Sequence, residues 1–520
     1  MSADTEILAS VGSLADPPDG GGVAWWRPSR SWLPSVTIGL VALVIYWFAR
    51  QTLIDDAYIT LAYARNVAFH LHWGLIPGET ANTATSVLNV LVLALFTAIT
   101  RHPIVALGIV YLLSTLATEY GVRRAARAAG LPEWAGLLAA VVIAADPLLM
   151  SSIGLETALG AGITALLLAA AVERRPVLFG LFAGLLVLTR PDLAVLVIVL
   201  FLVRRGWWRD WWRSVLTALA VTVPWYAWSW LRLDSIVPDT LLIKTNQGSW
   251  PGFGREYSFG SGPLLYLRDY PTATVLSFLP AVLGLLAVLI WLVARLARPT
   301  DRVRALSRFV PIAVAGLVHY AAYTLLGVPP YHWYYGPAII CLSIFLAASV
   351  ASVSGPLRVA PLALVVLLIL ATAGEYGRHG LPPRFAPIQT NWASPAEYQT
   401  LAIQTAAIAD GRPVLSSGEV GTEAFFCDCQ VIDEFGDRAQ VIPLLNDALA
   451  KASPLKRKIL DLNFHFLDRG QQPMTAKLAL EFIKPGTPIP ANAIKVWPVD
   501  SPWLPGPGPG PNHIVLVPTP

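Results

Sequence analysis

The sequence has 520 residues, of which 55% are hydrophobic and only 13% are charged, and its mean hydropathy is +0.57. Soluble domains carry about 25% charged residues, so this composition excludes an ordinary water-soluble enzyme and predicts a polytopic α-helical membrane protein. Three cysteines exclude a disulfide scaffold or a cysteine-built metal cluster, and a net charge of +4 gives no reason to expect a nucleic-acid partner.

The chain begins with a polar segment, residues 1–31, which we expect to be a disordered cytoplasmic tail. An apolar run from Trp32 to Phe48 follows, and its tryptophans near both ends suit the two membrane interfaces. Because no small-residue cleavage site follows this run, it predicts an uncleaved signal anchor.

Further apolar runs of span length follow along the chain. They lie at about 104–122, 134–150, 156–172, 214–231, 272–294, 309–326, 337–352 and 358–375. The stretch 176–203 is long enough for two short spans, interrupted at residues 189–192. Since a membrane-crossing helix needs about 20 residues, the pattern predicts about eleven transmembrane helices, with 83–100 lying along the membrane surface in a first outer loop, 51–103.

Clusters of arginine indicate the orientation, because cytoplasmic loops carry an excess of basic residues. With eleven spans, the clusters that fall inside are those at 123–127, 174–175, 204–213, 295–308 and 358. A twelfth span at 83–100 would place all of them outside. We therefore expect a multi-pass plasma-membrane protein with a transmembrane domain at 32–375 and a cytoplasmic N-terminus.

Beyond residue 375 charged residues become more frequent, and short β-like runs appear at 413–416, 430–432 and 513–517. Helices are predicted at about 395–409, 439–460 and 474–483. Residues 376–520 are therefore expected to form an extracytoplasmic α/β domain, with a Gly-Pro connector at 506–511 before its last strand.

Ionisable residues that the charge asymmetry does not explain are candidates for a site, because burying a charge in a membrane is costly. Asp55 and Asp56 directly follow the first span. One aspartate could cap a surface helix at 55–68 and stabilise it by about 1 kcal/mol. Capping does not explain the second aspartate. Glu156 lies where an outer turn leads into the next span. It could be an acid that caps the first turn of that helix, or it could be a residue of the site.

Arg190 and Asp192 flank Pro191, which forbids a continuous helix there. Broken helices at membrane depth are tolerated mainly where they line a cavity, although an Arg190–Asp192 ion pair of purely structural value is the alternative. Lys244 is the one lysine in the first 450 residues. Its ammonium could bind a phosphate or could simply be solvated.

The segment Tyr331–Tyr335 places His332 among four aromatic residues. An interfacial aromatic belt is the default explanation, and a contact of His332, Tyr334 and Tyr335 with phosphate or sugar is the alternative. Together, these loops suit a substrate with an anionic head and a lipid tail. Cations would hold the phosphate, and a carboxylate would take a proton from an attacking hydroxyl.

In chain order, the segments DDAYITLAYARN, PGETANTATSVLNVLV, MSSIGLETAL, VLTRPD and VPDTLLIKT resemble motifs of the GT-C superfamily of polyprenyl-phosphate-sugar glycosyltransferases. Over about residues 33–340 their order is most similar to the arabinofuranosyltransferase B-like proteins of mycobacteria. The resemblance implies a GT-C-like fold, a donor such as decaprenyl-phosphoryl-arabinofuranose, and a cell-envelope polysaccharide or lipoglycan as acceptor. It also implies a catalytic base at Asp55 or Asp56, with Asp55 slightly favoured because it leads the motif. Arg65, in the segment that follows these two acids, is a further substrate-binding candidate.

The chain departs from the family between Asn66 and Pro77, where relatives are glycine-rich and this chain carries His70 and His72. Their spacing occurs in metal sites, but no carboxylate partner is assignable, so no metal ligand is predicted and a divalent metal requirement stays open. A bridge between Cys427 and Cys429 is near the geometric limit, and free thiols are an equal alternative.

Other functions remain compatible with this sequence. A mannosyl- or other pentosyl- or hexosyltransferase of the same superfamily would use the same residues. A lipid-linked sugar transporter or flippase, or a non-catalytic binding protein, would not need the aspartates as a base.

Overall fold

The computed structural model describes residues 32–203, 210–246, 257–297, 300–378, 380, 383–503 and 511–519. The predicted tail at 1–31, most of the arginine cluster at 204–213 and most of the connector at 506–511 lie outside the described residues. Residues Pro34–Pro520 belong to one compact unit, so an independent domain at 376–520 remains a prediction.

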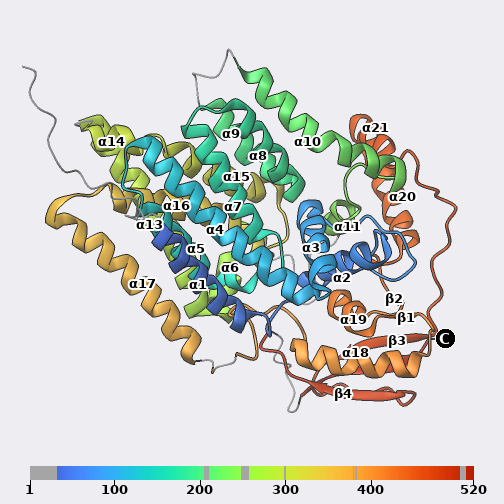
Figure 1. Ribbon diagram of the computed structural model, residues 1–520. Helices are drawn as coiled ribbons and strands as arrows, with labels where there is room; N and C mark the ends of the chain where they lie inside the picture. Colours follow the sequence, from blue (N-terminus) through green and yellow to red (C-terminus); the bar gives the residue numbers. More distant parts are fainter. Residues whose placement is uncertain are drawn as a thin grey trace, which may run out of the picture. The chain divides into compact units, whose positions relative to one another are not determined.

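The described chain up to residue 378 is helical (Figure 1). Its α-helices are α1 (Leu33–Ala49), α2 (Asp55–His70), α3 (Val87–Thr100), α4 (Pro103–Ala129), α5 (Ala135–Ala145), α6 (Pro147–Ser151), α7 (Thr157–Val172), α8 (Pro176–Thr189), α9 (Ala194–Leu202), α10 (Trp211–Arg232), α11 (Thr240–Asn246), α12 (Gly262–Asp269), α13 (Pro271–Ala297), α14 (Asp301–Leu306), α15 (Val310–Leu326), α16 (Gly336–Ser352) and α17 (Val359–Arg378). Short 3-10 turns are η2 (Pro191–Leu193), η5 (His332–Tyr335) and η6 (Gly355–Arg358).

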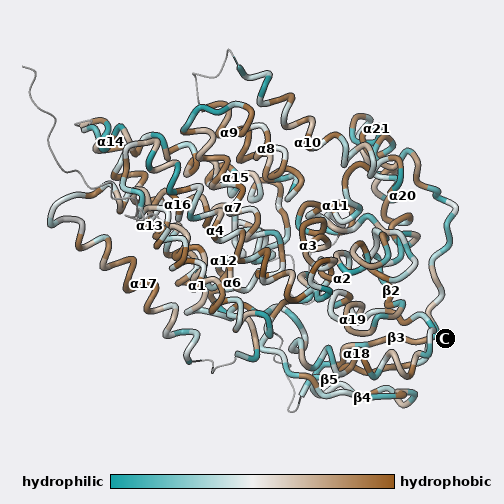
Figure 2. Tube along the Cα trace, in the orientation of Figure 1, coloured by the Kyte–Doolittle hydropathy of each residue, from teal (hydrophilic) through white to brown (hydrophobic). Residues whose placement is uncertain are grey.

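Four segments among the described residues are long and apolar enough to cross a membrane, namely Pro103–Ala129, Pro271–Ala297, His332–Ser352 and Val359–Arg378. Seven shorter segments of 10–17 residues are also apolar. Helix α17, for example, is brown along most of its length in Figure 2. These helices support a multi-pass membrane protein, while the number of eleven spans and the orientation remain predictions.

The helices are interrupted at Asp146 and at Arg190, and each interruption places an ionisable side chain at a helix end. Arg190 adopts an extended conformation between α8 and η2, because Pro191 supplies no N–H for a continuous helix. Asp146 separates α5 from α6, and its carboxylate accepts hydrogen bonds from the N–H groups of Leu148 at 3.0 Å and Leu149 at 3.1 Å. Each break therefore places an ionisable side chain where a helix begins or ends.

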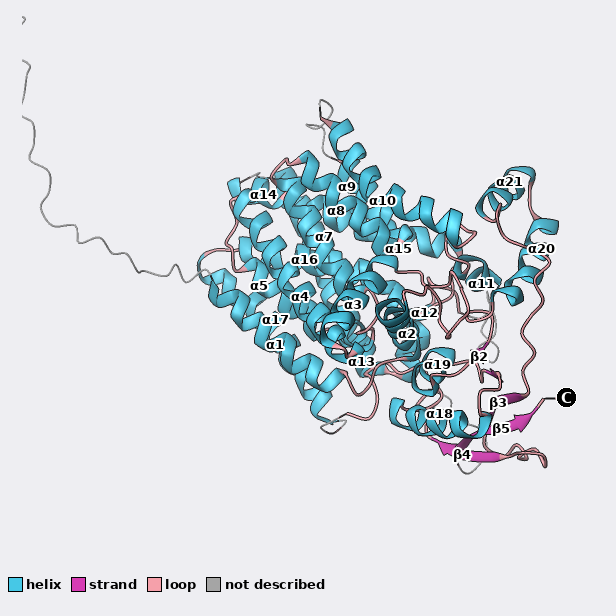
Figure 3. Cartoon of the chain, turned by 45° about the vertical axis from the view of Figure 1, so that its right-hand side comes forward, coloured by secondary structure: helices cyan, strands magenta, loops and turns pink. Residues whose placement is uncertain are grey.

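The C-terminal region, described at residues 383–503 and 511–519, contains the strands, drawn in magenta in Figure 3. Its elements are α18 (Pro395–Ala409), β1 (Val414–Leu415), α19 (Val420–Cys427), β2 (Val431–Ile432), η7 (Arg438–Gln440), α20 (Val441–Lys451), α21 (Pro454–Asn463), β3 (Leu478–Ile483), β4 (Lys495–Val499) and β5 (Asn512–Pro518). They form one sheet in the order β2-β1-β3-β5-β4, parallel at β2-β1-β3 and antiparallel at β3-β5-β4.

The helix predicted at 474–483 is wrong, because Leu478–Ile483 is the central strand β3. Its backbone is hydrogen-bonded to β1 on one side and β5 on the other, and tertiary pairing therefore overrides the local propensity of the segment. The helix predicted at 439–460 is two helices, since the Ser453 hydroxyl caps a new helix that begins at Pro454. The helix predicted at 395–409 is confirmed as α18.

Helix α2 connects the two parts of the protein. It packs against α3 on one side and against α19 of the C-terminal region on another. Gly421 at the start of α19 lies so close that an added Cβ would stand 2.2 Å from the backbone oxygen of Asp55. The C-terminal region is therefore in direct contact with the helix that carries both candidate catalytic aspartates.

Candidate active site

Asp55 and Asp56 begin α2, but their side chains have different surroundings. Asp55 is buried, with 6% of its surface exposed, and its carboxylate accepts hydrogen bonds from the start of α19. The donors are the Thr422 N–H at 2.6 Å, the Thr422 hydroxyl at 2.7 Å and the Gly421 N–H at 3.2 Å. Burial, and next the charge of Asp56, raise the pKa of Asp55 to about 6. Its oxygens are thus occupied by the C-terminal region.

Asp56 instead faces Lys244 of α11. The Lys244 ammonium lies 3.8 Å from the Asp56 carboxylate, whose side chain is 32% exposed. The same ammonium stands 3.9 Å from the ring centre of Tyr331 and 5.9 Å from that of Trp333. Burial alone would lower the pKa of Lys244, but Tyr331 and Asp56 together raise it above its usual value. Lys244 is therefore a stable cation next to an accessible carboxylate.

Arg190 is surrounded by partners at the break between α8 and α9. Its guanidinium donates to Glu156 at 3.1 Å, to Asp192 at 2.9 and 3.1 Å, and to the Tyr323 hydroxyl at 2.8 Å. Asp192 also lies 3.1 Å from Nε2 of His319. This network combines three of the residues that the sequence singled out, and it uses most of the donors of Arg190.

Tyr334 joins these two groups. The Arg190 guanidinium lies 4.8 Å from the Tyr334 ring centre, and that ring is 5.4 Å from the Tyr331 ring that Lys244 covers. We call Asp56, Lys244, Tyr331, Tyr334 and Arg190, with its partners Glu156 and Asp192, the reaction-site cluster. The structure thus brings together residues from five separate segments of the sequence.

The remaining sequence candidates lie elsewhere. His332 is fully buried and stands edge-on to the rings of Tyr266 and Trp333. Tyr335 is also buried, and its hydroxyl donates to the Phe259 carbonyl at 2.7 Å. These two residues therefore pack the interior of the protein.

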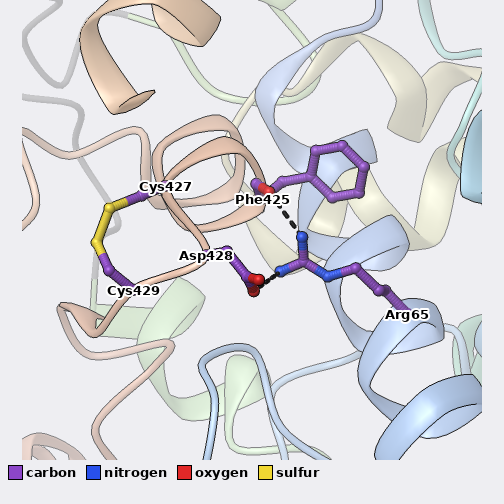
Figure 4. Close-up of a disulfide and its surroundings, with 5 residues drawn as sticks. All are labelled: Arg65, Phe425, Cys427, Asp428 and Cys429. Carbon is purple, nitrogen blue, oxygen red and sulfur yellow. Dashed lines mark hydrogen bonds and ion pairs between the residues drawn. A yellow bond between two sulfur atoms is a disulfide. The ribbon is translucent and has the colours of Figure 1, made fainter. Parts of the chain in front are cut away.

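Arg65 belongs to a contact with the C-terminal region, shown in Figure 4. Its guanidinium pairs with Asp428 at 2.8 Å and donates to the Phe425 carbonyl at 2.9 Å. Asp428 stands between Cys427 and Cys429, which form a disulfide with a Cα–Cα distance of 5.1 Å. The sequence left open whether Cys427 and Cys429 form a disulfide or are free thiols, and the structure has the disulfide.

The C-terminal region also positions Lys244. Asp239, fully buried, directly precedes α11 and pairs with Nε of Arg438 at 3.0 Å. The Asp239 N–H donates to the Asn82 carbonyl at 2.7 Å. Nearby, the Phe435 ring centre lies 5.6 Å from the Lys244 ammonium. Sequence reasoning missed Tyr331, Arg438 and Phe435, and the one available signal was the position of Tyr331 in the aromatic segment.

The described residues do not contain a group of three or more His, Cys, Asp and Glu side chains that could hold a metal ion. Within the reaction-site cluster, Glu156 and Asp192 are both bonded to Arg190. His72, one of the two histidines with metal-like spacing, is hydrogen-bonded through Nε2 to the Glu79 carbonyl at 2.9 Å. The donor set of the described residues therefore does not fit a resident metal.

Comparison with solved structures identifies the fold. The chain aligns with ArnT from Cupriavidus metallidurans, solved bound to undecaprenyl phosphate, with a TM-score of 0.51 and 15% identity over 94% of this chain and 98% of that chain. It aligns with the oligosaccharyltransferase of Archaeoglobus fulgidus, solved with zinc and sulfate, with a TM-score of 0.51 and 13% identity over 85% of this chain and 67% of that chain. The expected GT-C-like fold is thereby confirmed.

The mycobacterial arabinofuranosyltransferase AftD aligns with a TM-score of 0.47 and 17% identity over 95% of this chain and 40% of that chain, which carries no argument for arabinose. Neither the family models nor the curated protein sequences gave a match to this sequence.

Proposed function

We propose that this protein is a membrane-embedded glycosyltransferase that moves a sugar from a polyprenyl-phosphate donor to a cell-envelope polysaccharide or lipoglycan at the outer face of the plasma membrane. The observation that carries the proposal is the Asp56–Lys244 pair, a carboxylate 3.8 Å from an ammonium and beside tyrosine rings. The pair occurs in a fold shared with a protein that was solved bound to undecaprenyl phosphate.

Lys244 is the best-suited phosphate ligand of the cluster. Arg190, the other cation, already donates to Glu156, Asp192 and Tyr323. Among the described residues, Lys244 forms an ion pair with one carboxylate, that of Asp56 at 3.8 Å, and an ammonium is a compact charge that suits a phosphate oxygen. Arg190 then acts as a support that holds the Tyr334 ring against the site.

Asp56 is proposed as the base that receives the proton of the acceptor hydroxyl. The acceptor oxygen forms a bond to the anomeric carbon of the donor sugar, and the bond from that carbon to the phosphate oxygen breaks. Its electron pair leaves with the polyprenyl phosphate, whose added charge Lys244 offsets. The hydroxyl proton passes to the Asp56 carboxylate and from there to solvent, so the products are a glycan longer by one sugar and polyprenyl phosphate.

Asp56 is proposed in preference to Asp55, which the order of the motif had slightly favoured. The Asp55 carboxylate is buried and accepts three hydrogen bonds from Gly421 and Thr422, whereas the Asp56 carboxylate is partly exposed and can be reached by a substrate. We propose arabinofuranose as the donor sugar because of the motif order, with mannose or another pentose or hexose as the alternative. In this proposal the N-terminus is cytoplasmic and the C-terminal region is extracytoplasmic.

A transfer assay with purified full-length protein tests the proposal. The protein is incubated with decaprenyl-phosphoryl-arabinofuranose and with polyprenyl-phosphoryl-mannose, each with a matching oligosaccharide acceptor, and product is measured. We expect transfer from one donor and a loss of 10²–10⁴-fold in Asp56→Asn, the usual contribution of a general base. The matched control is Asp447→Asn, whose carboxylate pairs with a lysine on the surface.

Two results would reject an enzymatic role. One is the same slow transfer by wild type and Asp56→Asn with every donor. The other is movement of labelled lipid-linked sugar across vesicles without formation of a glycosidic bond, which would establish the flippase alternative.

A further inference from the structure

A cavity of about 1100 Å³ lies where the C-terminal region meets the ends of α1 and α4. Helix α2 contributes Tyr58 and Arg65 to its wall. Tyr58 follows Asp56 by two residues, which is about 200° around a helix. The cavity and the reaction-site cluster therefore lie on different faces of α2, and the transfer reaction proposed above makes no use of this cavity.

Basic side chains outnumber acidic ones on the cavity wall. Arg65 and Arg384 both have acidic partners, Asp428 at 2.8 Å for the first and Glu397 at 2.7 Å for the second. Two basic side chains are left, Arg50 and His102. The wall therefore retains positive charge that no acid of the described chain neutralises.

Arg50 and His102 share a position in the fold. Arg50 directly follows the last residue of α1, and His102 directly precedes the first residue of α4. The Arg50 guanidinium stacks on Trp47 at 3.5 Å from the ring centre, and no described acidic residue forms an ion pair with it. Since α1 and α4 are apolar helices, the Arg50 guanidinium and the His102 imidazole stand at the edge of the apolar bundle.

The rest of the wall is largely aromatic and apolar. Phe425 and Phe426 of α19 contact the Tyr58 ring, with ring centres 5.3 and 5.0 Å apart, and Ile104 and Trp497 add further apolar surface. A site that binds only a small soluble anion does not require aromatic and apolar side chains around it. The Arg50 guanidinium, with an imidazole that can donate a hydrogen bond and with apolar surface beside it, instead matches a molecule with an anionic head and an apolar body.

We propose that this cavity binds a phosphate-bearing membrane amphiphile, with its phosphate between Arg50 and His102 and its apolar part against Ile104 and Phe426. A guanidinium matches the geometry of a phosphate, with two parallel N–H donors. The volume of about 1100 Å³ is slightly above the usual range for small-ligand pockets, about 300–1,000 Å³. The source is an anionic phospholipid or a polyprenyl phosphate, which share this chemistry.

The test is lipid binding to the purified full-length protein in neutral detergent, measured by native mass spectrometry. The probes are short-chain phosphatidylglycerol, undecaprenyl phosphate, short-chain phosphatidylcholine and inorganic phosphate, all added to the Lys244→Gln background so that the reaction-site cluster does not contribute. We expect one of the first two to bind at least tenfold more tightly than phosphatidylcholine. Arg50→Gln/His102→Gln then weakens binding at least tenfold, and Thr400→Trp, which fills the cavity from α18, does the same.

Arg101→Gln is the matched control, because Arg101 adjoins His102 but stacks on Phe69 and does not line the cavity. It is expected to bind like the parent protein. Tighter binding of phosphatidylglycerol identifies a phospholipid, and tighter binding of undecaprenyl phosphate identifies the prenyl carrier. Equal binding by the double variant and the parent, an unchanged affinity in Thr400→Trp, or binding of inorganic phosphate alone would each overturn the proposal.

Discussion

Asp55 and Asp56 are neighbours in the chain, but the partners of their carboxylates differ. Asp55 reaches Gly421, which lies 366 positions further along the chain, whereas Asp56 reaches Lys244. The sequence could indicate that one of two adjacent acids exceeds what capping requires. It could not indicate which of the two acids is accessible, because Asp55 is hydrogen-bonded to residues that approach it only in the folded chain.

Replacing Asp55 by asparagine should destabilise the contact between α2 and α19. An asparagine would turn an NH₂ group toward the N–H donors of α19, and an unsatisfied buried group costs about 1–3 kcal/mol. We expect a lower unfolding temperature and a smaller loss of transfer than in Asp56→Asn. Thermal unfolding and the transfer assay measure both, with exposed Asp461→Asn as the control. An unchanged unfolding temperature together with abolished transfer would identify Asp55 as the base instead.

Glu423 makes the stability of the protein depend on pH; its buried carboxyl group accepts hydrogen bonds from Ser416 and Ser417. Burial raises the pKa of Glu423 to about 8, from the ordinary value of about 4.5 for a solvated glutamate. Between about pH 4.5 and pH 8, Glu423 is therefore protonated in the folded protein and ionised in the unfolded chain. The stabilisation is complete below about pH 4.5 and is lost as the pH rises to about 8, by at most about 1.4 kcal/mol per pH unit.

Thermal unfolding between pH 5 and 9 checks this, with Glu423→Gln compared with the wild type. The variant should lose stability less steeply with rising pH, because glutamine does not titrate. Glu481→Gln, at an exposed position of β3, should keep the wild-type slope. A Glu423→Gln slope as steep as that of the wild type would contradict the assignment.

At the scale of elements, the break at Pro191 and the strands β1, β2 and β5 were predictable from the sequence, and β3 was not. Pro191 forbids a continuous helix wherever it occurs, so the break that exposes Arg190 follows from local chemistry. Strand β3 was predicted as a helix, because its hydrogen bonds go to β1, more than 60 residues before it, and to β5. Local sequence does not contain that information.

The close contact between α19 and α2 gives a prediction at this scale. In Gly421→Ala the new methyl would stand 2.2 Å from the Asp55 backbone oxygen, so the two helices must separate. Overpacking of this kind costs about 1–3 kcal/mol. We expect a lower unfolding temperature together with reduced transfer, because the start of α2 carries Asp56. Gly374→Ala in α17, where an added Cβ meets nothing within 4 Å, is the control. Full activity and stability in Gly421→Ala would show that this contact does not position α2.

At the scale of the whole molecule, composition sufficed to predict a membrane protein, and the order of short motifs sufficed to predict its GT-C-like fold. The way in which the C-terminal region completes the site was not predictable. It holds α2 through Gly421 and Thr422, and it holds the start of α11 through Arg438. The C-terminal region therefore supports both members of the Asp56–Lys244 pair from residues that lie far from them in the sequence.

The most direct test of this account separates the two members of that pair by steady-state kinetics with the polyprenyl-phosphate sugar that the protein uses. Asp56→Asn should lower kcat by 10²–10⁴-fold with little change in the KM for the donor, because the base acts on the acceptor proton. Lys244→Gln should raise the donor KM at least tenfold, because the phosphate loses its cation. The exposed pair Asp447→Asn and Lys451→Gln should change neither constant. Wild-type kcat in Asp56→Asn, or an unchanged donor KM in Lys244→Gln, would contradict the placement of the reaction at this pair.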